Sequence, residues 1–260
     1  MSGSENPTLI GRTALVTGAG SGIGLAIARM LRDEGATVLF HDVVAAAEQT
    51  AKELGATFIS ADLGDPARVR ELIDQLREAA PAGVDILVNN AGFQHIAPVD
   101  EFPEEIWIKL VQVLLIAPFQ LTKALLPAMK ERKWGRIINI ASIHGVIASP
   151  GKSAYIAAKH GLIGLTRTVA LETGDYGITA NALCPAYVRT PLVERQIAQQ
   201  ADLHGISEEA VINKIMLAPA AIKRLIEPSE VASFVRFLIS DEASSITGSV
   251  QMMDLGWTAR

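Results

Sequence analysis

The feature that most constrains this chain is a glycine-rich loop between a buried strand and a helix. The apolar run at 13–17 is typical of a strand buried on both faces, and helical spacing begins again at 25–31. Between them, Thr17-Gly-Ala-Gly-Ser-Gly-Ile-Gly24 would let a pyrophosphate approach backbone N–H groups at a helix N-terminus. The pattern predicts a dinucleotide site. Its contacts would be Gly18, Ser21, Gly22, Ile23 and Gly24.

An acidic residue at the end of the next predicted strand, 36–42, indicates which nucleotide would bind. Asp42 lies about 20 residues beyond the loop, where a carboxylate can bond the ribose 2′-hydroxyl. It would repel a 2′-phosphate, and no arginine follows it closely. The sequence therefore favours NAD over NADP. The alternative is that Asp42 is only a strand-end turn residue.

Strands and helices alternate along the rest of the chain. This alternation predicts an α/β fold, a doubly wound (Rossmann) parallel sheet of about seven strands in a single domain spanning 1–260. Residues 190–226 fall outside the alternation and are expected to form a helical lid over the site. Ligands should bind beyond the carboxyl ends of the strands. Strands are predicted at 57–60, 84–89, 137–140, 178–183 and 249–253, and helices at 66–79, 104–130 (interrupted at Pro118) and 155–172.

Composition narrows the range of partners. A net charge of −5 gives no reason to expect nucleic acid or an acidic membrane. The single cysteine, Cys184, excludes an internal disulfide and is expected to be a small buried hydrophobe. Segment 1–7 lacks the features of a signal peptide, and no run is expected to be long and apolar enough to span a bilayer. We therefore expect a cytoplasmic protein, with no metal site.

Tyr155 and Lys159 stand four residues apart in a predicted helix and should share one face. A free phenol has a pKa of about 10, too high for a base at neutral pH, but a nearby cation would lower it. Ser142 ends the apolar run 136–142 and could hold a substrate oxygen. A functional role for Tyr155 and Lys159 is better supported because the same chain also carries a predicted nucleotide-binding loop.

These motifs resemble the short-chain dehydrogenase/reductase family, of the NAD-dependent type, over nearly the whole length of the chain. The matching segments are Thr17–Gly24, Asp62-Leu63, Asn89-Asn-Ala-Gly92, Ser142, Tyr155-x-x-x-Lys159 and Pro185-x-x-Val188-Arg-Thr190. Within the family the chain is most similar to the D-3-hydroxybutyrate dehydrogenases. That similarity is carried by Phe93-Gln94-His95, Ala141-Ser-Ile-His144-Gly145, Lys152-Ser-Ala-Tyr155, Arg189–Gln196 and Gly256–Arg260.

The resemblance implies a role for each matching residue. Tyr155 would be the acid/base, Lys159 its electrostatic helper and a ribose ligand, and Ser142 the clamp on the carbonyl or alcohol. Asp62 and Leu63 would bracket the adenine. The remaining cofactor contacts would be Asn89, Ala91 and Gly92 on the adenosine side, Val188 and Thr190 at the carboxamide, and Pro185.

The similarity to the hydroxybutyrate enzymes also implies a substrate, (R)-3-hydroxybutyrate or its oxo acid, acetoacetate. The residues that would hold its carboxylate are Gln94, His144, Lys152 and Gln196, and Tyr187 should line the acyl pocket. Lys152 lies three residues before Tyr155, and His144 two after Ser142, so a cation and a donor flank the catalytic groups. The family likeness further implies a homotetramer, with the apolar segment 250–257 in a subunit contact.

The chain departs from the family pattern at three positions. Leu114 stands where the family usually carries an asparagine that relays protons from Lys159 to bulk water. Because Pro118 lacks an N–H four residues later, we hypothesise that the free carbonyl of Leu114 still holds the relay water. Ala186 replaces a usual glycine, and Tyr187 a larger aromatic.

Two other functions fit the same motifs. One is a different reductase of the family, acting on 3-oxoacyl carriers, sugars or steroid alcohols; Asp42 disfavours the NADPH-using ones. The other is a weakly catalytic NAD-binding sensor or scaffold, which only Leu114 supports.

Overall fold

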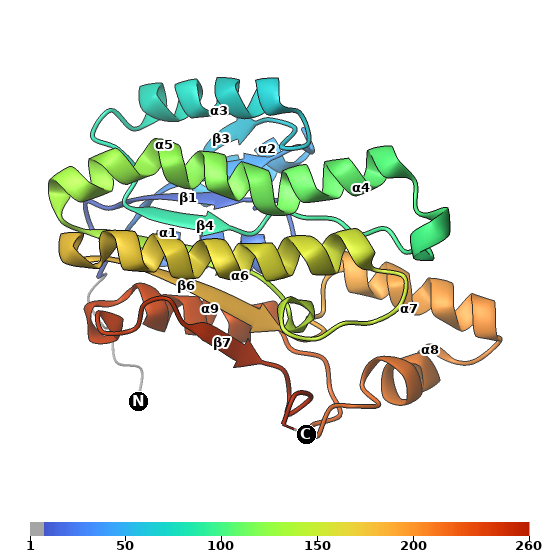
Figure 1. Ribbon diagram of the computed structural model, residues 1–260. Coiled ribbons are helices and arrows are strands. Elements are labelled where there is room, and N and C mark those ends of the chain that lie inside the picture. Colours follow the sequence, from blue (N-terminus) through green and yellow to red (C-terminus); the bar gives the residue numbers. More distant parts are fainter. Residues whose placement is uncertain (1–7, 260) are drawn as a thin grey trace.

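The computed structural model describes residues 8–259; segment 1–7, where no signal peptide is expected, and Arg260 lie outside the described residues. A seven-stranded parallel sheet with the order β3-β2-β1-β4-β5-β6-β7 forms its centre (Figure 1). The prediction of a doubly wound α/β fold is confirmed. The strands are β1 (Thr13–Thr17), β2 (Thr37–Asp42), β3 (Thr57–Ser60), β4 (Ile86–Asn89), β5 (Gly135–Ile140), β6 (Ile178–Pro185) and β7 (Val250–Met253).

The strand order reverses beside β1. The chain builds outward from β1 through β2 and β3, then returns to add β4 on the other side of β1. In a doubly wound sheet this reversal opens a crevice beyond the carboxyl ends of the two central strands. The loop after β1 and the loop after β4 therefore face each other across it.

Helices cover both faces of the sheet, as a parallel sheet requires. In Figure 1, α3, α5 and α6 lie across one face, while α1 and α9 lie behind it. The long helices are α1 (Gly22–Asp33), α2 (Ala47–Leu54), α3 (Pro66–Ala79), α4 (Glu104–Val111), α5 (Ala117–Arg132), α6 (Ser153–Thr173), α7 (Pro191–His204) and α9 (Pro228–Ile239). Short helical turns are η1 (Val99–Glu101), η2 (Gln112–Ile116), η3 (Ile143–Gly145), η4 (Gly174–Tyr176), α8 (Glu208–Ala210), η5 (Val211–Met216) and η6 (Asp241–Ala243).

A wider turn replaces the helix interruption that the sequence predicts at Pro118. The π-helical turn η2 joins α4 to α5, and within it the Ala117 N–H bonds the Gln112 carbonyl, five residues back. Pro118 has no N–H with which to continue an α-helical ladder. The π-helical turn lets the helix pass this residue without a break.

The resulting helical stretch Glu104–Arg132 is long and apolar enough to cross a bilayer by length and composition. The expectation that no such run exists is therefore wrong. Half of its most apolar window is buried in the fold. Leu121, Leu125 and Met129 of this stretch belong to the core beneath α3 and α5, so packing against the sheet accounts for part of its apolar character.

The segment 190–226 projects to one side of the sheet as α7, α8 and η5 (Figure 1). It has a small apolar core of its own, which includes Val193, Ile197 and Val211. Its two ends are pinned together, because Arg189 N donates to Ile226 O at 2.8 Å. The projection is thus attached at a narrow base beside the carboxyl end of β6.

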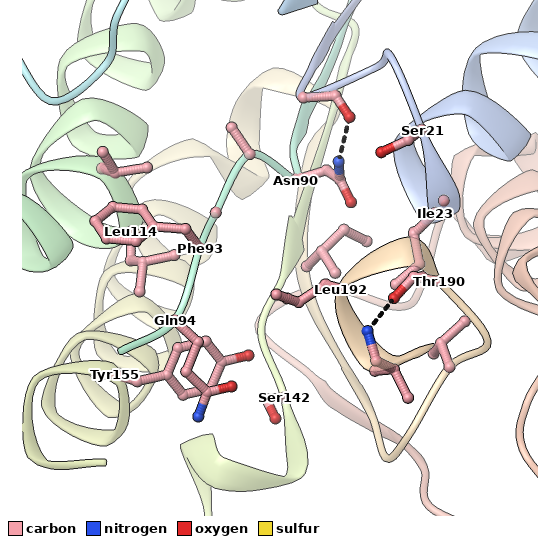
Figure 2. Close-up of a pocket in the computed structure, with 18 of the residues that line it drawn as sticks. Ser21, Ile23, Asn90, Phe93, Gln94, Leu114, Ser142, Tyr155, Thr190 and Leu192 are labelled. Atoms are coloured by element: carbon pink, nitrogen blue, oxygen red, sulfur yellow. Dashed lines mark hydrogen bonds between the residues drawn. The ribbon is translucent and has the colours of Figure 1, made fainter. Parts of the chain in front are cut away.

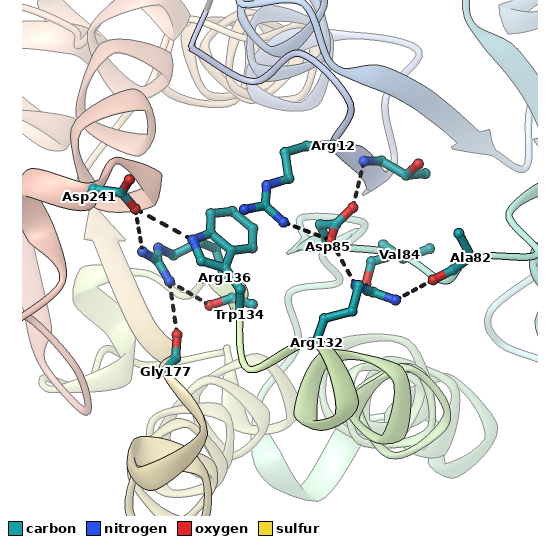
Figure 3. A network of polar contacts seen from close by, with 11 residues as sticks. Arg12, Ala82, Val84, Asp85, Arg132, Trp134, Arg136, Gly177 and Asp241 are labelled. Atoms are coloured by element: carbon teal, nitrogen blue, oxygen red, sulfur yellow. Dashed lines mark hydrogen bonds and ion pairs between the residues drawn. The ribbon is translucent and has the colours of Figure 1, made fainter.

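A network of charged residues ties the opposite, amino end of the sheet (Figure 3). The ring of Trp134 lies between the guanidinium groups of Arg12, at 3.8 Å, and Arg136, at 4.4 Å. Asp85 pairs with both Arg12, at 3.3 Å, and Arg132, at 3.1 Å. Cation–π contacts and ion pairs of this kind fix the strand starts relative to one another.

Candidate active site

A cavity of about 890 Å³ lies over the carboxyl ends of the strands. In Figure 2, Ser142, Tyr155 and Gln94 lie toward one end of it, and Ser21, Asn90 and Thr190 toward the other. The cavity brings together every predicted site residue except Gly24 and Asn89. Residues separated by more than 170 positions in the sequence therefore face one space.

The glycine loop fits a pyrophosphate. Gly18 and Gly22 have φ of +64° and +54°, a region that favours glycine. A Cβ on Gly24 would collide with the Gly18 carbonyl, so Gly24 lets α1 start against the loop without itself lining the cavity. Ser21 makes no side-chain cap bond to α1, which leaves the first N–H groups of that helix open to an anion.

Asn90 holds the glycine loop, whereas Asn89 points elsewhere. The Asn90 side-chain amide donates to the carbonyls of Thr17, at 2.9 Å, and Gly18, at 3.0 Å (Figure 2). The Asn89 amide donates instead to Asn139 Oδ1 at 2.8 Å. Successive residues at a strand end face opposite sides, and this period of two is the signal that separates the neighbours.

Asp42 closes one end of the glycine loop. Its Oδ2 accepts the Gly20 N–H at 2.8 Å, and its Oδ1 accepts the Val44 N–H at 2.9 Å. The half-buried carboxylate lines the cavity. A negative charge fixed at this position suits a ribose hydroxyl and opposes a phosphate.

Lys109 of α4 reaches the cavity beside Asp62. It was not among the site residues predicted from the sequence. Its Nζ lies 2.9 Å from Asp62 Oδ2, and this hydrogen bond lowers the pKa of the Asp62 carboxyl. Leu63, next in sequence, is buried and also lines the cavity. The one usable signal for Lys109 was its place in the helix that follows β4 in the alternation.

The Pro185-x-x-Val188-Arg-Thr190 segment lines the cavity beyond β6. Val188 forms a bridge with Ile226 at the base of the projection. Thr190 is the N-cap of α7 and accepts from Val193 N at 3.3 Å. Ala186, in place of the usual glycine, keeps a backbone bond to β7 through Met253 O at 2.9 Å.

Ser142, Tyr155 and Lys159 lie together at the other end. Lys159 is 4% exposed and donates from Nζ to the Ile140 carbonyl at 2.6 Å, so the end of β5 holds its ammonium. Ser142 Oγ accepts the His144 N–H at 3.1 Å, which leaves the Ser142 proton free to donate. Hydrogen bonding to Ser142 lowers the pKa of Tyr155, although it is not the largest effect on that residue.

Burial dominates the titration of this pair. It raises the pKa of Tyr155 to about 12 and lowers the pKa of Lys159 to about 8. The expectation that Lys159 makes Tyr155 acidic is thus wrong for the protein without its cofactor. The reason is that burial of the phenol disfavours its charged form, while the Lys159 ammonium is held by a backbone carbonyl.

Leu114 lies within the π-helical turn and lines the cavity, 2% exposed. A Cβ on Gly92 would meet Leu114 Cδ2 at 2.8 Å, so the leucine side chain fills the space above that glycine. Turns of this width recur at functional sites because they redirect backbone carbonyls. The carbonyl relay through Leu114 stays a prediction.

Four polar side chains line the cavity with the Ser142 and Tyr155 hydroxyls. Gln196 of α7 donates to Gln94 Oε1 at 3.3 Å, which links the projection to the loop after β4. The His144 and Tyr155 rings meet edge to face at 6.2 Å. Burial, followed by the charge of Lys152, lowers the pKa of His144 to about 4, so this histidine is neutral at pH 7.

Tyr187 lines the cavity and contacts both a cation and a second aromatic ring. Lys152 Nζ lies 5.9 Å from the centre of the Tyr187 ring, and burial lowers the pKa of that lysine. The centre of the Trp257 ring lies 5.9 Å from that of Tyr187. The C-terminal segment therefore supports the wall of the cavity.

Comparison with known proteins agrees with this geometry. A family model described as Enoyl-(Acyl carrier protein) reductase matches residues 18–258. A D-beta-hydroxybutyrate dehydrogenase from Rhizobium meliloti (strain 1021) is 44% identical over 257 residues, 96% of this chain and 99% of the relative. The chain belongs to the short-chain dehydrogenase/reductase family. A second D-beta-hydroxybutyrate dehydrogenase, from Cupriavidus necator, is 42% identical over 257 residues, 97% of this chain and all of the relative.

A solved member of the short-chain dehydrogenase/reductase family has the same fold. It is described as an NAD(P)-dependent gluconate 5-dehydrogenase from Beutenbergia cavernae with NADP bound at low occupancy. The two structures align with a TM-score of 0.86 and 35% identity, over 98% of this chain and all of the other. The chain is therefore an oxidoreductase with a nucleotide cofactor, and its glycine loop and open helix N-terminus fit such a group.

Proposed function

We propose that this short-chain dehydrogenase/reductase uses NAD to interconvert (R)-3-hydroxybutyrate and acetoacetate. The observation that carries the proposal is the grouping of one cation and three neutral polar side chains around the Ser142 and Tyr155 hydroxyls. A small acid needs this charge, because a carboxylate left unpaired in a closed site is unfavourable. The grouped side chains are Lys152, His144, Gln94 and Gln196. The names of the two relatives from Rhizobium meliloti and Cupriavidus necator support the same substrate.

Three residues would handle the reacting hydroxyl. Ser142 would donate its free proton to the substrate oxygen and fix its position. Tyr155, as the phenolate, would take the hydroxyl proton and become the neutral phenol, and Lys159 would stabilise the phenolate before this transfer. NAD, when bound, supplies the acceptor for the hydride that leaves C3. The buried positions of Ser142 and Lys159 would keep bulk water away from this transfer.

The choice of NAD rests on Asp42. Its carboxylate is held by two backbone N–H groups on the cavity wall, and a 2′-phosphate at that point would meet a fixed negative charge. The solved relative from Beutenbergia cavernae carries NADP, so family membership alone does not decide between the two nucleotides.

The projection 190–226 would act as the lid. Six of its first residues, from Thr190 to Gln196, line the cavity, and its narrow base at Val188 and Ile226 suits a hinge. The hydrogen bond between the Gln196 and Gln94 side chains would be replaced by hydrogen bonds from these residues to a bound carboxylate.

Assembly as a homotetramer in the cytoplasm, without a nucleic-acid or membrane partner, is also part of the proposal. Every residue from 250 to 257 keeps partial exposure, which suits a segment shared between a cavity wall and a subunit contact. Ile116 and Phe119, on the outer side of the α4–α5 helix, are 39% and 47% exposed and offer further apolar surface. Size-exclusion chromatography with light scattering tests the tetramer.

The deciding experiment is NADH formation with each enantiomer of 3-hydroxybutyrate, run beside a neutral secondary alcohol and gluconate. We expect activity on the R enantiomer with NAD and far less with NADP. Activity on a neutral alcohol or on gluconate, with none on either 3-hydroxybutyrate enantiomer, would overturn the substrate while leaving the family unchanged.

A further inference from the structure

The loop 146–152, between η3 and α6, carries a hydroxyl that the proposed reaction does not use. Ser149 Oγ lies 2.8 Å from His144 Nε2. Ser149 is half-buried, and His144 is 7% exposed on the cavity wall. One nitrogen of the His144 ring is therefore engaged by the protein, and only Nδ1 is left for a ligand.

The surroundings of His144 determine whether its Nδ1 atom carries a proton and is available to a ligand. No residue in the described part of the chain bonds this atom, and it is not sealed away from the cavity. The ring is neutral at pH 7, because burial and the charges of Lys152 and His160 oppose its protonation. A neutral imidazole carries one proton, and the hydrogen bond at one nitrogen decides which nitrogen holds it.

We propose that Ser149 donates its proton to His144 Nε2 and so fixes the Nδ1–H tautomer, which presents an uncharged N–H donor to the substrate carboxylate. The proposal rests on the proposed function for the anionic nature of the ligand. A hydroxyl can donate or accept, but only donation leaves a proton on Nδ1. The other tautomer would turn a lone pair toward a carboxylate in a buried site, which is unfavourable.

The loop is built to hold Ser149 in place. Ile147 N donates to Ile143 O at 3.0 Å, and Ala97 N donates to Gly151 O at 3.0 Å, so the loop is anchored on both sides of the serine. Gly151 has a φ of +77°, a conformation that side chains other than glycine disfavour. Ser149 is thus a positioning residue that acts through His144.

The kinetic test compares three variants. Ser149→Ala should raise KM for (R)-3-hydroxybutyrate about tenfold, the loss expected for one hydrogen bond to a charged group. Its kcat and its Kd for NAD should stay within about twofold of the wild type, since the change is in ground-state binding. Ser149→Thr keeps the hydroxyl and should restore KM. Ser153→Ala is the matched control, because the Ser153 hydroxyl is buried nearby with no hydrogen-bond partner.

The tautomer itself is measured by 15N NMR of the histidine side chains. The chain has five histidines, and His144→Gln assigns the signal. At pH 7 we expect a protonated Nδ1 and a bare Nε2 in the wild type, and a shift toward the Nε2–H form in Ser149→Ala. A purely structural role would lower thermal stability without moving this signal. A wild-type Nε2–H tautomer, or no change in Ser149→Ala, would overturn the proposal.

The two readouts separate this inference from the proposed function. The NMR measurement needs no turnover. If neither enantiomer is oxidised, the substrate assignment fails while the tautomer still decides the role of Ser149. If oxidation proceeds and the tautomer is unaffected by Ser149, only the present inference fails.

Discussion

The Nζ atom of Lys159 lies 5.6 Å from the centre of the Tyr155 ring. The two residues share a helix face, as their spacing predicts, but the protein alone favours the neutral phenol. Burial is the larger influence on both pKa values. If Tyr155 is the proposed base, a bound positive charge beside the ring is needed to lower its pKa, and an oxidised nicotinamide cofactor would carry such a charge.

Replacing Tyr155 by phenylalanine removes the proposed acid/base and keeps the ring. We expect kcat to fall by at least about 10²-fold, the usual range for a lost general base, while Kd for NAD changes less than about threefold. NADH absorbance and cofactor fluorescence titration measure the two quantities. Tyr176→Phe, an exposed tyrosine on η4, is the control. Turnover comparable to wild type in Tyr155→Phe would refute the assignment.

Lys159→Met tests whether the Lys159 ammonium is desolvated, through the pH dependence of the free energy of unfolding. The folded pKa of about 8 lies below the ordinary 10.5, so the unfolded chain binds more protons between these values. The free energy of unfolding of the wild type should therefore rise from pH 7 to 9.5 by about 2 kcal/mol more than that of the variant. Denaturant titrations at both pH values measure it. Equal changes in the two proteins would mean that Lys159 is not desolvated.

Leu114→Asn tests the relay through a backbone carbonyl. If the carbonyl already holds the relay water, the added amide should raise kcat less than about threefold, while stability falls by about 2–4 kcal/mol through lost packing. Leu110→Asn, in the same apolar cluster but off the cavity, should destabilise without any gain in rate. A tenfold or larger rise in kcat for Leu114→Asn would show that the relay needs a side-chain amide.

Asp42→Ala tests the cofactor preference. Removing the fixed carboxylate should raise the ratio of kcat/KM for NADP over NAD by more than about tenfold, since one repulsive charge is lost. Asp33→Ala changes the same charge at the far end of α1 and should leave the ratio unchanged. An unaltered ratio in Asp42→Ala would remove the basis for choosing NAD.

Patterns of apolar residues were sufficient to predict the sheet. Buried parallel strands are continuous apolar runs, and all seven lie where these runs predict them. The strand ends also located Asp42, Asp62 and Ser142 at one edge, because carboxyl ends of parallel strands converge. Contacts that depend on local geometry could not be predicted from these patterns. Asn89 and Asn90 differ only in which way a strand end points, and Lys109 joins the site through a contact with Asp62, 47 residues away in the sequence.

The pKa shifts of Tyr155 and Lys159 could not be predicted from their spacing. An i, i+4 spacing places two groups on one face but says nothing of how much protein covers them. That cover reverses the expected shift of Tyr155. The π-helical turn was likewise hidden, because Pro118 signals a lost hydrogen bond but not whether the chain kinks or widens.

The widened turn at 112–116 has a consequence for the helix on either side of it. Each residue of an α-helix rotates the chain by about 100°, so the extra residue offsets the phase of α5 from that of α4 by roughly that angle. The side of α4 that carries Lys109 toward the cavity and the side of α5 that packs toward the sheet are thereby set independently. Deleting one residue here would remove this offset and force one of these two alignments to be lost.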